Sequence, residues 1–396
     1  MRTYILWMAL LSYWGFKSQP DLATSRKPAS EIYAVRQDTN KLRNSALTFE
    51  RFQLLAAAEN IKSVLFNSAG TKLYALNLEG MCIYEFDQSS KQMLRRISFK
   101  PTRASGWDYA LHKAIPSYAE KPIEACFSHQ DRILWVSLHN AGGIVPLVLD
   151  TLLAQRPISF SAEKQAWITD FEQQRQDTLH LRLLKTGEIP KVIAKTADDK
   201  FLMVSNWGTK SLSVFSLNDT LAPYAMKIAS IPMPGIPRGI AVDDEKGKTY
   251  VAIMGGNQIA VIDHKNWKLE RCFPVGRNPR HLLMGREGRL FASFNAISQV
   301  ACYQAGTGKL LFKTGTHLQP RSIALSADQQ YLFVTCYEGN RMEVFKISSR
   351  GFTRVYSFKC TGKPVGIALY ENKYRLEAWV SCYLEDRLKV FVFRKS

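Results

Sequence analysis

Short apolar runs, separated by charged or glycine-containing turns, fill most of the chain from about residue 60 onward. Within these runs Val, Ile, Leu, Phe and Tyr alternate with small or polar residues, as in Phe-Leu-Met-Val-Ser-Asn over 201–206. A period of two is the pattern of half-buried β-strands. The pattern therefore predicts a chain built from many short strands, with little helix.

One group of strands recurs seven times. The first strands of the copies read NIKSVLF, KPIEACF, IPKVIAK, IPRGIAV, NPRHLLM, QPRSIAL and KPVGIAL. A second and a third apolar strand follow each of them. The prolines at 190, 237, 279, 320 and 364 are 47, 42, 41 and 44 residues apart, which is about one blade of a β-propeller or WD40-like repeat.

A single antiparallel meander cannot cover both of its own faces, so copies of this kind must stack, and a closed ring leaves none uncovered. Seven copies predict an all-β, seven-bladed β-propeller of four-stranded antiparallel blades over residues 46–396. The last copy ends at its third strand, RLKVFVFRKS, while strand-like residues 46–55 precede the first copy. We expect this N-terminal strand to complete the last blade and close the ring.

The first 45 residues have a different character. Arg2 is followed by an apolar run, Tyr4 to Phe16, that only Ser12 interrupts. This run has the length of a signal-peptide core and is too short to span a membrane. We predict a signal peptide or N-terminal apolar segment over 1–18, a polar linker over 19–45, and export to the periplasm or cell surface with no transmembrane span after leader removal. An uncleaved anchor or a buried N-terminal segment is the alternative.

Several second strands carry a family resemblance. The segments FLMVSN (201–206), YLFVTC (331–336) and AWVSC (378–382) resemble the YVTN repeat of surface-layer-type and YncE-like propellers of bacteria and archaea. The similarity runs from about residue 60 to the end and is strongest from Pro190 onward. It implies a seven-bladed propeller, but it does not imply a function, because propellers host binding, scaffolding and catalysis alike.

The position directly after each repeat proline is unusually basic. Five of its seven occupants are cationic, namely Lys62, Lys191, Arg238, Arg280 and Arg321. Propeller symmetry places equivalent positions on one circle, so we expect a ring of cations around one channel mouth. An anion bound among them would relieve their mutual repulsion. Alternatively, each cation pairs with a nearby carboxylate or turns outward into water.

The charge of the whole chain points the same way. The formal net charge is +19, and removal of Arg2 and Lys17 with a leader leaves +17. Such a balance favours anionic partners. We predict recognition of an anionic small molecule or polymer, or of a partner protein. Single-stranded nucleic acid is possible, although Trp107 and Trp207 are not interleaved with Lys or Arg as a stacking groove requires.

Two insertions interrupt the repeat. The first, near 101–120, is predicted to be a loop that concentrates Trp107 and Asp108, and the second, near 151–178, a loop with a short helix before a strand. Long loops in compact folds often carry function. We expect Trp107 and Asp108 to contribute to ligand specificity, unless the aromatic residues only pack the insertion onto the propeller.

Polar side chains also occupy the turns that follow two second strands. These are His139 and Asn140 in one copy and Asn206 and Trp207 in the next. Such side chains either contact a ligand or hydrogen-bond the turn itself. We include all four among the candidate ligand-binding residues.

A catalytic site is harder to assemble. Pro279-Arg280-His281 resembles the Pro-Arg-His element of lactonase propellers, where such residues face the substrate, and this makes His281 a further candidate. An Asn-Glu pair typically follows in that family, but the corresponding segment Phe291–Asn295 contains no acid. Lactone hydrolysis is therefore an alternative to the main prediction, a non-enzymatic binding propeller of the cell envelope.

Motifs for cofactors and metals are not found in the sequence. It has no phosphate-binding glycine loop, GxSxG or HExxH motif, and its seven cysteines include no CxxC. We predict neither a cofactor nor a metal and assign no catalytic residue. Cys336 and Cys382 occupy equivalent positions in successive copies, which are usually too far apart to bridge.

Overall fold

The computed structural model describes residues 46–108, 111–149, 164–218 and 224–396. Residues Leu42–Ser396 form one compact unit. The predicted signal peptide over 1–18 and linker over 19–45 lie outside the described residues.

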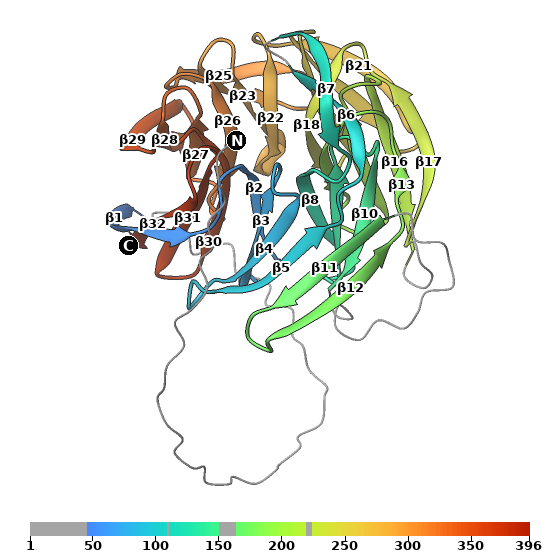
Figure 1. Ribbon diagram of the computed structural model, residues 1–396. Coiled ribbons are helices and arrows are strands. Elements are labelled where there is room, and N and C mark those ends of the chain that lie inside the picture. The colour runs from blue at the N-terminus through green and yellow to red at the C-terminus, as the bar shows by residue number, and fades with distance from the viewer. Residues whose placement is uncertain (1–45, 109–110, 150–163, 219–223) are drawn as a thin grey trace, which may run out of the picture. The chain divides into compact units, whose positions relative to one another are not determined.

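Seven sheets surround a central channel, and the repeated first strands are their innermost strands (Figure 1). Each innermost strand contacts the next one along the chain, and the last contacts the first, so the ring is closed. These strands are β2 (Ile61–Phe66), β8 (Pro122–Ser128), β14 (Pro190–Lys195), β18 (Ile236–Asp243), β22 (Pro279–Met284), β26 (Pro320–Leu325) and β30 (Pro364–Glu371). The predicted seven-bladed propeller is confirmed.

The remaining strands of each blade follow outward in antiparallel order. Blades 1 to 3 contain β3 (Lys72–Asn77), β4 (Cys82–Asp87) and β5 (Met93–Phe99); β9 (Ile133–Leu138), β10 (Gly143–Val148) and β13 (Leu184–Lys185); and β15 (Phe201–Asn206), β16 (Ser211–Leu217) and β17 (Ala225–Pro232). Blades 4 and 5 contain β19 (Lys248–Met254), β20 (Gln258–Asp263) and β21 (Lys268–Pro274); and β23 (Arg289–Phe294), β24 (Gln299–Gln304) and β25 (Lys309–Gly315). Blades 6 and 7 contain β27 (Tyr331–Cys336), β28 (Arg341–Ser348) and β29 (Gly351–Lys359); and β31 (Arg375–Cys382), β32 (Arg387–Lys395) and β1 (Leu47–Ala56).

Helical structure is nearly absent from the part of the chain that the structure describes. It consists of a single 3₁₀ turn, Arg286–Gly288. No helix among the described residues is long and apolar enough to cross a bilayer.

The second strand of each blade lies between two neighbouring sheets, and its side chains are buried on both faces. All six residues of β9 and all six of β27 are buried. Trp135 of β9, for example, packs with Ile193 and Phe215 of the next blade. Burial on both faces explains why the second strands are nearly continuous apolar runs.

The N-terminal strand closes the ring as predicted. β1 pairs antiparallel with β32, from Leu47 opposite Lys395 to Ala56 opposite Arg387. The Phe49 ring lies 4.6 Å from that of Phe358 and 5.7 Å from that of Phe393, measured between centroids. The two ends of the propeller domain therefore meet in one blade.

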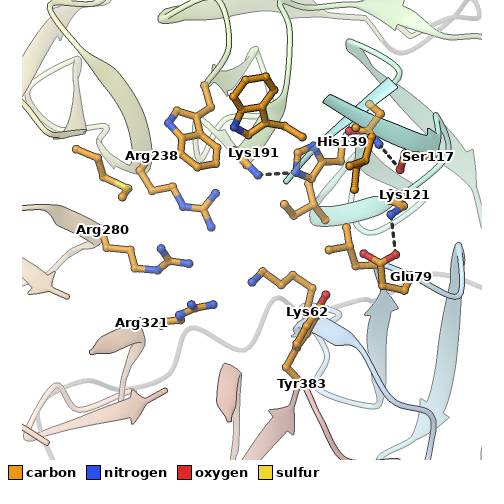
Figure 2. Close-up of a pocket in the computed structure, with 18 residues that line it drawn as sticks. Lys62, Glu79, Ser117, Lys121, His139, Lys191, Arg238, Arg280, Arg321 and Tyr383 are labelled. Atoms are coloured by element: carbon orange, nitrogen blue, oxygen red, sulfur yellow. Dashed lines mark hydrogen bonds and ion pairs between the residues drawn. The ribbon is translucent and has the colours of Figure 1, made fainter. Parts of the chain in front are cut away.

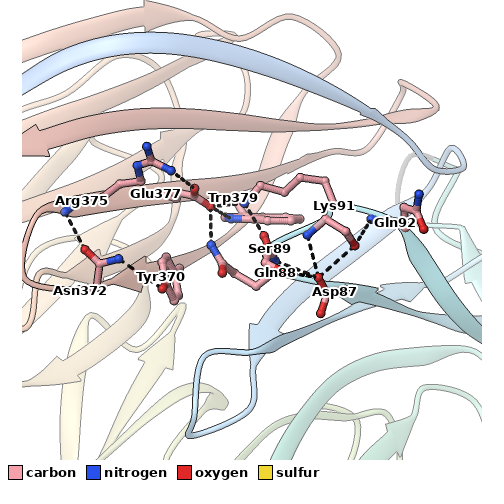
Figure 3. Close-up of polar contacts among 11 residues, drawn as sticks. Asp87, Gln88, Ser89, Lys91, Gln92, Tyr370, Asn372, Arg375, Glu377 and Trp379 are labelled. Carbon is pink, nitrogen blue, oxygen red and sulfur yellow. Dashed lines mark hydrogen bonds and ion pairs between the residues drawn. The ribbon is translucent and has the colours of Figure 1, made fainter. Parts of the chain in front are cut away.

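A buried carboxylate fastens blade 7 to blade 1 (Figure 3). Glu377 of β31 is 1% exposed. Its Oε2 accepts hydrogen bonds from Gln88 Nε2 and Trp379 Nε1, both at 3.0 Å, and also pairs with Lys91. Gln88 and Lys91 belong to the turn after β4, so this cluster joins the first blade to the last.

Both insertions differ from the loops that the sequence suggested. The first forms a β-hairpin of β6 (Arg103–Asp108) and β7 (Lys113–Tyr118). In the second, β11 (Lys164–Asp170) and β12 (Arg175–Leu181) form a hairpin that pairs with β5 and extends blade 1 to six strands. The expected short helix is not present over 164–178, because alternating residues there pair with the open edge of β5; residues 151–163 lie outside the described residues.

Replacement of the aromatic side chain that anchors the closing strand should weaken the whole domain. Phe49→Ala is expected to lower the free energy of unfolding by about 2 kcal/mol, because it removes an apolar side chain from an aromatic cluster. Phe52→Ala lies on the same strand at a side chain that is 45% exposed, and should cost less than half as much. Urea unfolding followed by circular dichroism measures both; equal losses would contradict the anchoring role of Phe49.

Candidate functional site

A β-bulge at the start of every innermost strand positions the basic residues. The pairing register of the first and second strands shifts directly after the repeat proline or its equivalent, for example between Pro190 and Ile193 and between Pro279 and Leu282. The same shift occurs in the other five blades. A bulge breaks the strict alternation of side chains and re-aims them. The residue after the proline is thereby freed from the ladder.

In four blades, a hydroxyl group on the second strand holds the bulge of its own blade and bonds the innermost strand of the next blade. In blade 3, Ser205 Oγ accepts a hydrogen bond from the backbone N–H of Val192 at 3.1 Å and donates to the carbonyl of Arg238 in blade 4 at 2.8 Å. Ser137, Ser293 and Thr335 make the same two bonds in their blades, and their second bonds reach the carbonyls of Lys191, Arg321 and Val365.

Blade 1 has no such hydroxyl, because Leu76 stands at the equivalent position of β3, and neither has blade 4, where Ala252 stands at that position of β19. There the backbones approach more closely instead. A Cβ atom on Gly239 would lie 2.7 Å from the carbonyl oxygen of Arg280 and 2.8 Å from the backbone nitrogen of Leu282. Only glycine permits this approach, which seats blade 4 against blade 5.

The five ring residues line one cavity of about 450 Å³ at the channel mouth. Figure 2 shows Arg238, Arg280 and Arg321 extending into it from one side and Lys62 from the other. Lys191 and Arg238 are buried, at 4% and 7% exposure. The five basic side chains thus lie around one cavity. Their role in ligand binding remains a prediction.

Three of these cations form no ion pair among the described residues. The side chains of Lys62, Arg280 and Arg321 make no hydrogen bond or ion pair within that part of the chain, although Glu124 lies close enough to Lys62 and Arg280 to raise their pKa values. Lys62 Nζ lies 5.2 Å from the centroid of the Tyr383 ring. Lys191 donates to Nε2 of His139 at 2.9 Å. The alternative in which each cation pairs with a carboxylate does not describe Lys62 or Arg280.

Burial and the neighbouring positive charges make the charged forms of the ring residues unfavourable. Burial holds the pKa of Lys62 and of Lys191 well below its ordinary value, and neighbouring arginines lower both further. Burial and Arg238 act on Arg280 in the same direction, and burial lowers the pKa of Arg321 to about 10. Arginine keeps its proton at neutral pH, so Arg280 and Arg321 remain charged although burial first, and repulsion second, disfavours their charge; a bound anion would offset both effects.

A second layer of side chains, which the sequence analysis recognised only in part, lies above the cations. It comes from the residue that follows each second strand, and the members that line the cavity are Leu78, His139, Trp207, Met254 and Tyr383. Lys191 Nζ lies 4.7 Å from the Trp207 ring centroid, and the Arg321 guanidinium lies 3.4 Å from that of Tyr337. Alignment of this position across the repeats would have found the layer.

The β6–β7 hairpin forms one wall of the cavity. Gly106, Trp107, Ile115 and Ser117 line it, and Trp107 is 46% exposed. Asn140 Nδ2 ties the hairpin to blade 2 by donating to Ser117 Oγ at 3.1 Å and to the carbonyl of Tyr118 at 2.9 Å. Asn140 therefore borders the cavity while it anchors the hairpin.

Three other predicted site residues lie elsewhere. Asp108 accepts a hydrogen bond from the backbone N–H of Leu111 in the hairpin turn. Asn206 is fully buried and donates to Ser211 Oγ at 3.1 Å and Ser213 Oγ at 2.9 Å. Neither lines the cavity. Asn206 is the last residue of β15, and its side chain is directed into the blade, towards β16. His281 lies deeper in the channel.

The deeper part of the channel forms a cavity of about 230 Å³ that His281 and Glu124 line together with Lys62, Arg238, Arg280 and Arg321. Burial raises the pKa of Glu124, while Arg238 and Lys62 lower it. The sequence analysis missed Glu124; the available signal was an acid two residues after Pro122, where the other copies have none. Topology brings it from blade 2 to the cations of blades 1, 4, 5 and 6.

His281 is poorly placed to act as a base. Its Nδ1 accepts a hydrogen bond from the backbone N–H of Ile323 at 2.9 Å, so Nε2 carries the ring proton. Burial lowers its pKa to about 4, which keeps the imidazole neutral at pH 7. A neutral Nε2–H can donate a hydrogen bond to an anion, but it cannot accept a proton.

Over the described residues, no group of three or more His, Cys, Asp or Glu side chains gathers as metal ligands would.

The chain matches no protein-family model. Antigen Lp49 of Leptospira interrogans serogroup Icterohaemorrhagiae serovar copenhageni (strain Fiocruz L1-130) is 21% identical over 262 residues, which cover 59% of this chain and 56% of that protein. The match thus spans just over half of this relative's length.

Similar folds occur among solved structures. A chain of the mitotic checkpoint complex has a TM-score of 0.59 and 12% identity, and the match covers 97% of this chain and 99% of that one. Hydrazine synthase of Kuenenia stuttgartiensis has a TM-score of 0.59, 12% identity and coverages of 85% and 96%. U3-55K has a TM-score of 0.62, 9% identity and coverages of 86% and 98%. These likenesses support the fold alone.

Two half-buried histidines should make the protein sensitive to acid. Burial lowers the pKa of His139 to about 3 and that of His281 to about 4, whereas both titrate near 6.5 when the chain is unfolded. Below pH 6.5 the unfolded state therefore binds more protons, and stability falls as pH decreases through this window. His281→Asn should lose less of its melting temperature between pH 7 and 4.5 than the wild type does.

His180→Asn is the matched control, because His180 lies exposed on β12. It should retain the acid sensitivity of the wild type. The same slope in all three proteins would contradict the assignment to His281.

Proposed function

We propose that this protein is a non-enzymatic binding propeller of the cell envelope that recognises an anionic ligand at its channel mouth. One observation carries the proposal: Lys62, Lys191, Arg238, Arg280 and Arg321 line a single cavity, whose acids are Glu79, already paired with Lys121, and, just below the cations, Glu124. Lys191 and Arg238 are buried and the other three cations are half-buried. Charges withdrawn from water are normally paired or coordinated. An anion from outside the chain supplies the missing partner.

The cavity favours a small ligand over a polymer. Its volume of about 450 Å³ lies within the usual range of small-molecule pockets. Trp107, Ile115, Trp207 and Met254 add apolar and aromatic surface beside the cations. The ligand class that fits is a carboxylated or phosphorylated molecule whose planar or apolar part lies against these side chains.

Neutralisation of one ring arginine should separate binding from stability. Arg280→Gln is expected to raise the melting temperature of the free protein, because it relieves repulsion, and to abolish most of the stabilisation that sulfate, phosphate or gluconate gives the wild type. A ligand at one hundred times its Kd stabilises by about 2.7 kcal/mol. Thermal unfolding with each anion in turn measures both effects.

Arg277→Gln is the matched control, since Arg277 is exposed three residues before Arg280 and does not line the cavity. It should behave as the wild type does in both respects. An anion-induced shift that survives in Arg280→Gln and in Arg280→Gln/Arg321→Gln would remove the ring from consideration. A shift seen with oligothymidylate and not with the small anions would favour nucleic acid instead.

Anion binding should also take up protons. The pKa values of Lys62 and Lys191 are lowered in the free protein, and a bound anion raises them towards 10.5. Sulfate keeps its charge of −2 across neutral and alkaline pH, so its affinity should fall as pH rises from 7 to 10. Calorimetry in buffers of different ionisation enthalpy detects the uptake; pH-independent binding without proton uptake would contradict the role of the two lysines.

A lactone hydrolase is the second candidate, and the presence of Glu124 and His281 in one cavity favours it. Against it stands the Nε2–H tautomer of His281, which leaves Glu124 as the base. Hydrolysis of a lactone that Glu124→Gln abolishes would support this candidate over the binding role.

Family and location belong to the same proposal. The repeat pattern supports a YVTN-type, YncE-like assignment, and the apolar N-terminal run supports export to the periplasm or cell surface. The partial likeness to a protein named as an antigen is in keeping with an envelope location. Fractionation of the native host tests it, with the protein expected outside the cytoplasmic fraction.

A further inference from the structure

Consecutive blades meet at a recurring pair of positions. One is the residue just after the outermost strand of a blade, whose backbone N–H donates to the turn between the second and third strands. The other lies at the end of the second strand in the next blade. The pairs in blades 3 to 7 are Met233 with Ile253, Val275 with Phe294, Thr316 with Cys336, and Cys360 with Cys382.

The pair between blades 6 and 7 consists of two thiols in contact. Cys360 is 0% exposed and Cys382 is 1% exposed, and their Sγ atoms lie 3.5 Å apart. At the preceding junction, Thr316 takes the place of Cys360, and so Cys336 has no thiol neighbour there. Cys382 is therefore in contact with Cys360. The sequence analysis compared Cys382 only with Cys336, its equivalent in the preceding repeat, and did not reveal this contact.

We propose that Cys360 and Cys382 form an intrachain disulfide when the protein folds in the presence of a disulfide donor. A disulfide has an S–S distance of about 2 Å, so the sulfurs need to approach by only about 1.5 Å. Cys360 directly follows β29, and Cys382 is the last residue of β31, so regular strands hold both backbones on either side of the connection 361–363. The cross-link would tie the outer edge of blade 6 to the middle of blade 7. This inference does not depend on the proposed binding function.

The reaction is a thiol–disulfide exchange. One cysteine, as its thiolate, attacks a sulfur of the donor, such as glutathione disulfide, and releases one thiol of the donor. The second cysteine then attacks the mixed disulfide and releases the other donor thiol. Two protons and two electrons leave the protein thiols, and the donor disulfide is reduced to two thiols.

The environment of the pair indicates when this exchange occurs. Contact with Cys382 and burial raise the pKa of the Cys360 thiol, while Lys389 acts in the opposite direction. Lys389 is held nearby by Glu385, at 2.7 Å, and by the carbonyl of Thr361, at 2.9 Å. Buried thiols of raised pKa react slowly. Exchange is therefore fast before blade 7 packs against blade 6 and slow afterwards.

The test is to refold the reduced, denatured protein in a glutathione redox buffer, alkylate the remaining thiols and analyse the tryptic peptides by mass spectrometry. Lys373 and Arg375 separate the two cysteines, so a bridge joins two different peptides. We expect a Cys360–Cys382 cross-link and a melting temperature about 5 °C higher than that of the reduced protein.

Two variants keep the result interpretable. Cys360→Val copies the residue that Val275 supplies at an equivalent junction, and should lose both the cross-link and the redox-dependent shift while it still folds. Cys336→Ser should keep both. Alkylation of Cys360 and Cys382 in the refolded wild type, or a redox-dependent shift that Cys360→Val retains, would overturn the proposal.

Discussion

The hydroxyl group that bridges two innermost strands is the interaction on which the candidate site depends. In blade 3, Ser205 bonds the bulge of its own blade and the carbonyl of Arg238 in the next. Without the bulge, strand alternation would decide where the next side chain points, and without the second bond the neighbouring blade would be free to shift. The same contact recurs at four of the junctions between blades and fixes the backbones of Lys191, Arg238 and Arg321, so that a repeat in sequence becomes an arc of side chains in space.

That circle concentrates charge in a place where charge is unfavourable. Lys62 and Arg280 form no ion pair in the described part of the chain. Of the acids that line the two cavities, Glu79 is paired with Lys121, and burial raises the pKa of Glu124. The energy that closes the ring comes from elsewhere: from doubly buried second strands and from the aromatic cluster around Phe49. Stability at the periphery thus permits an arrangement at the axis that would not persist alone.

The sequence was sufficient for the parts of the molecule that repeat. The number of blades, the closing strand and the common circle of Lys62, Lys191 and Arg280 all follow from a period and from symmetry. What does not repeat was predicted less well. The β6–β7 hairpin was expected to be a loop, and the region of β11 and β12 a loop with a short helix before a strand, because whether an alternating segment pairs depends on an open strand edge nearby. Glu124 was missed because a single acid has meaning only beside cations that lie far away in sequence.

The β11–β12 hairpin changes how the first two blades relate to each other. The chain leaves blade 2 after β10, adds two strands to blade 1, and returns to give blade 2 its short outer strand β13. Blade 1 thus gains two strands from a segment that lies within the sequence of blade 2, whereas blades 3 to 6 are each completed by consecutive strands. The chain therefore joins blades 1 and 2 three times, and joins each later pair of neighbouring blades from 3 to 6 only once. The relative positions of Lys62, Glu124 and His139 are thus set by three covalent connections as well as by packing.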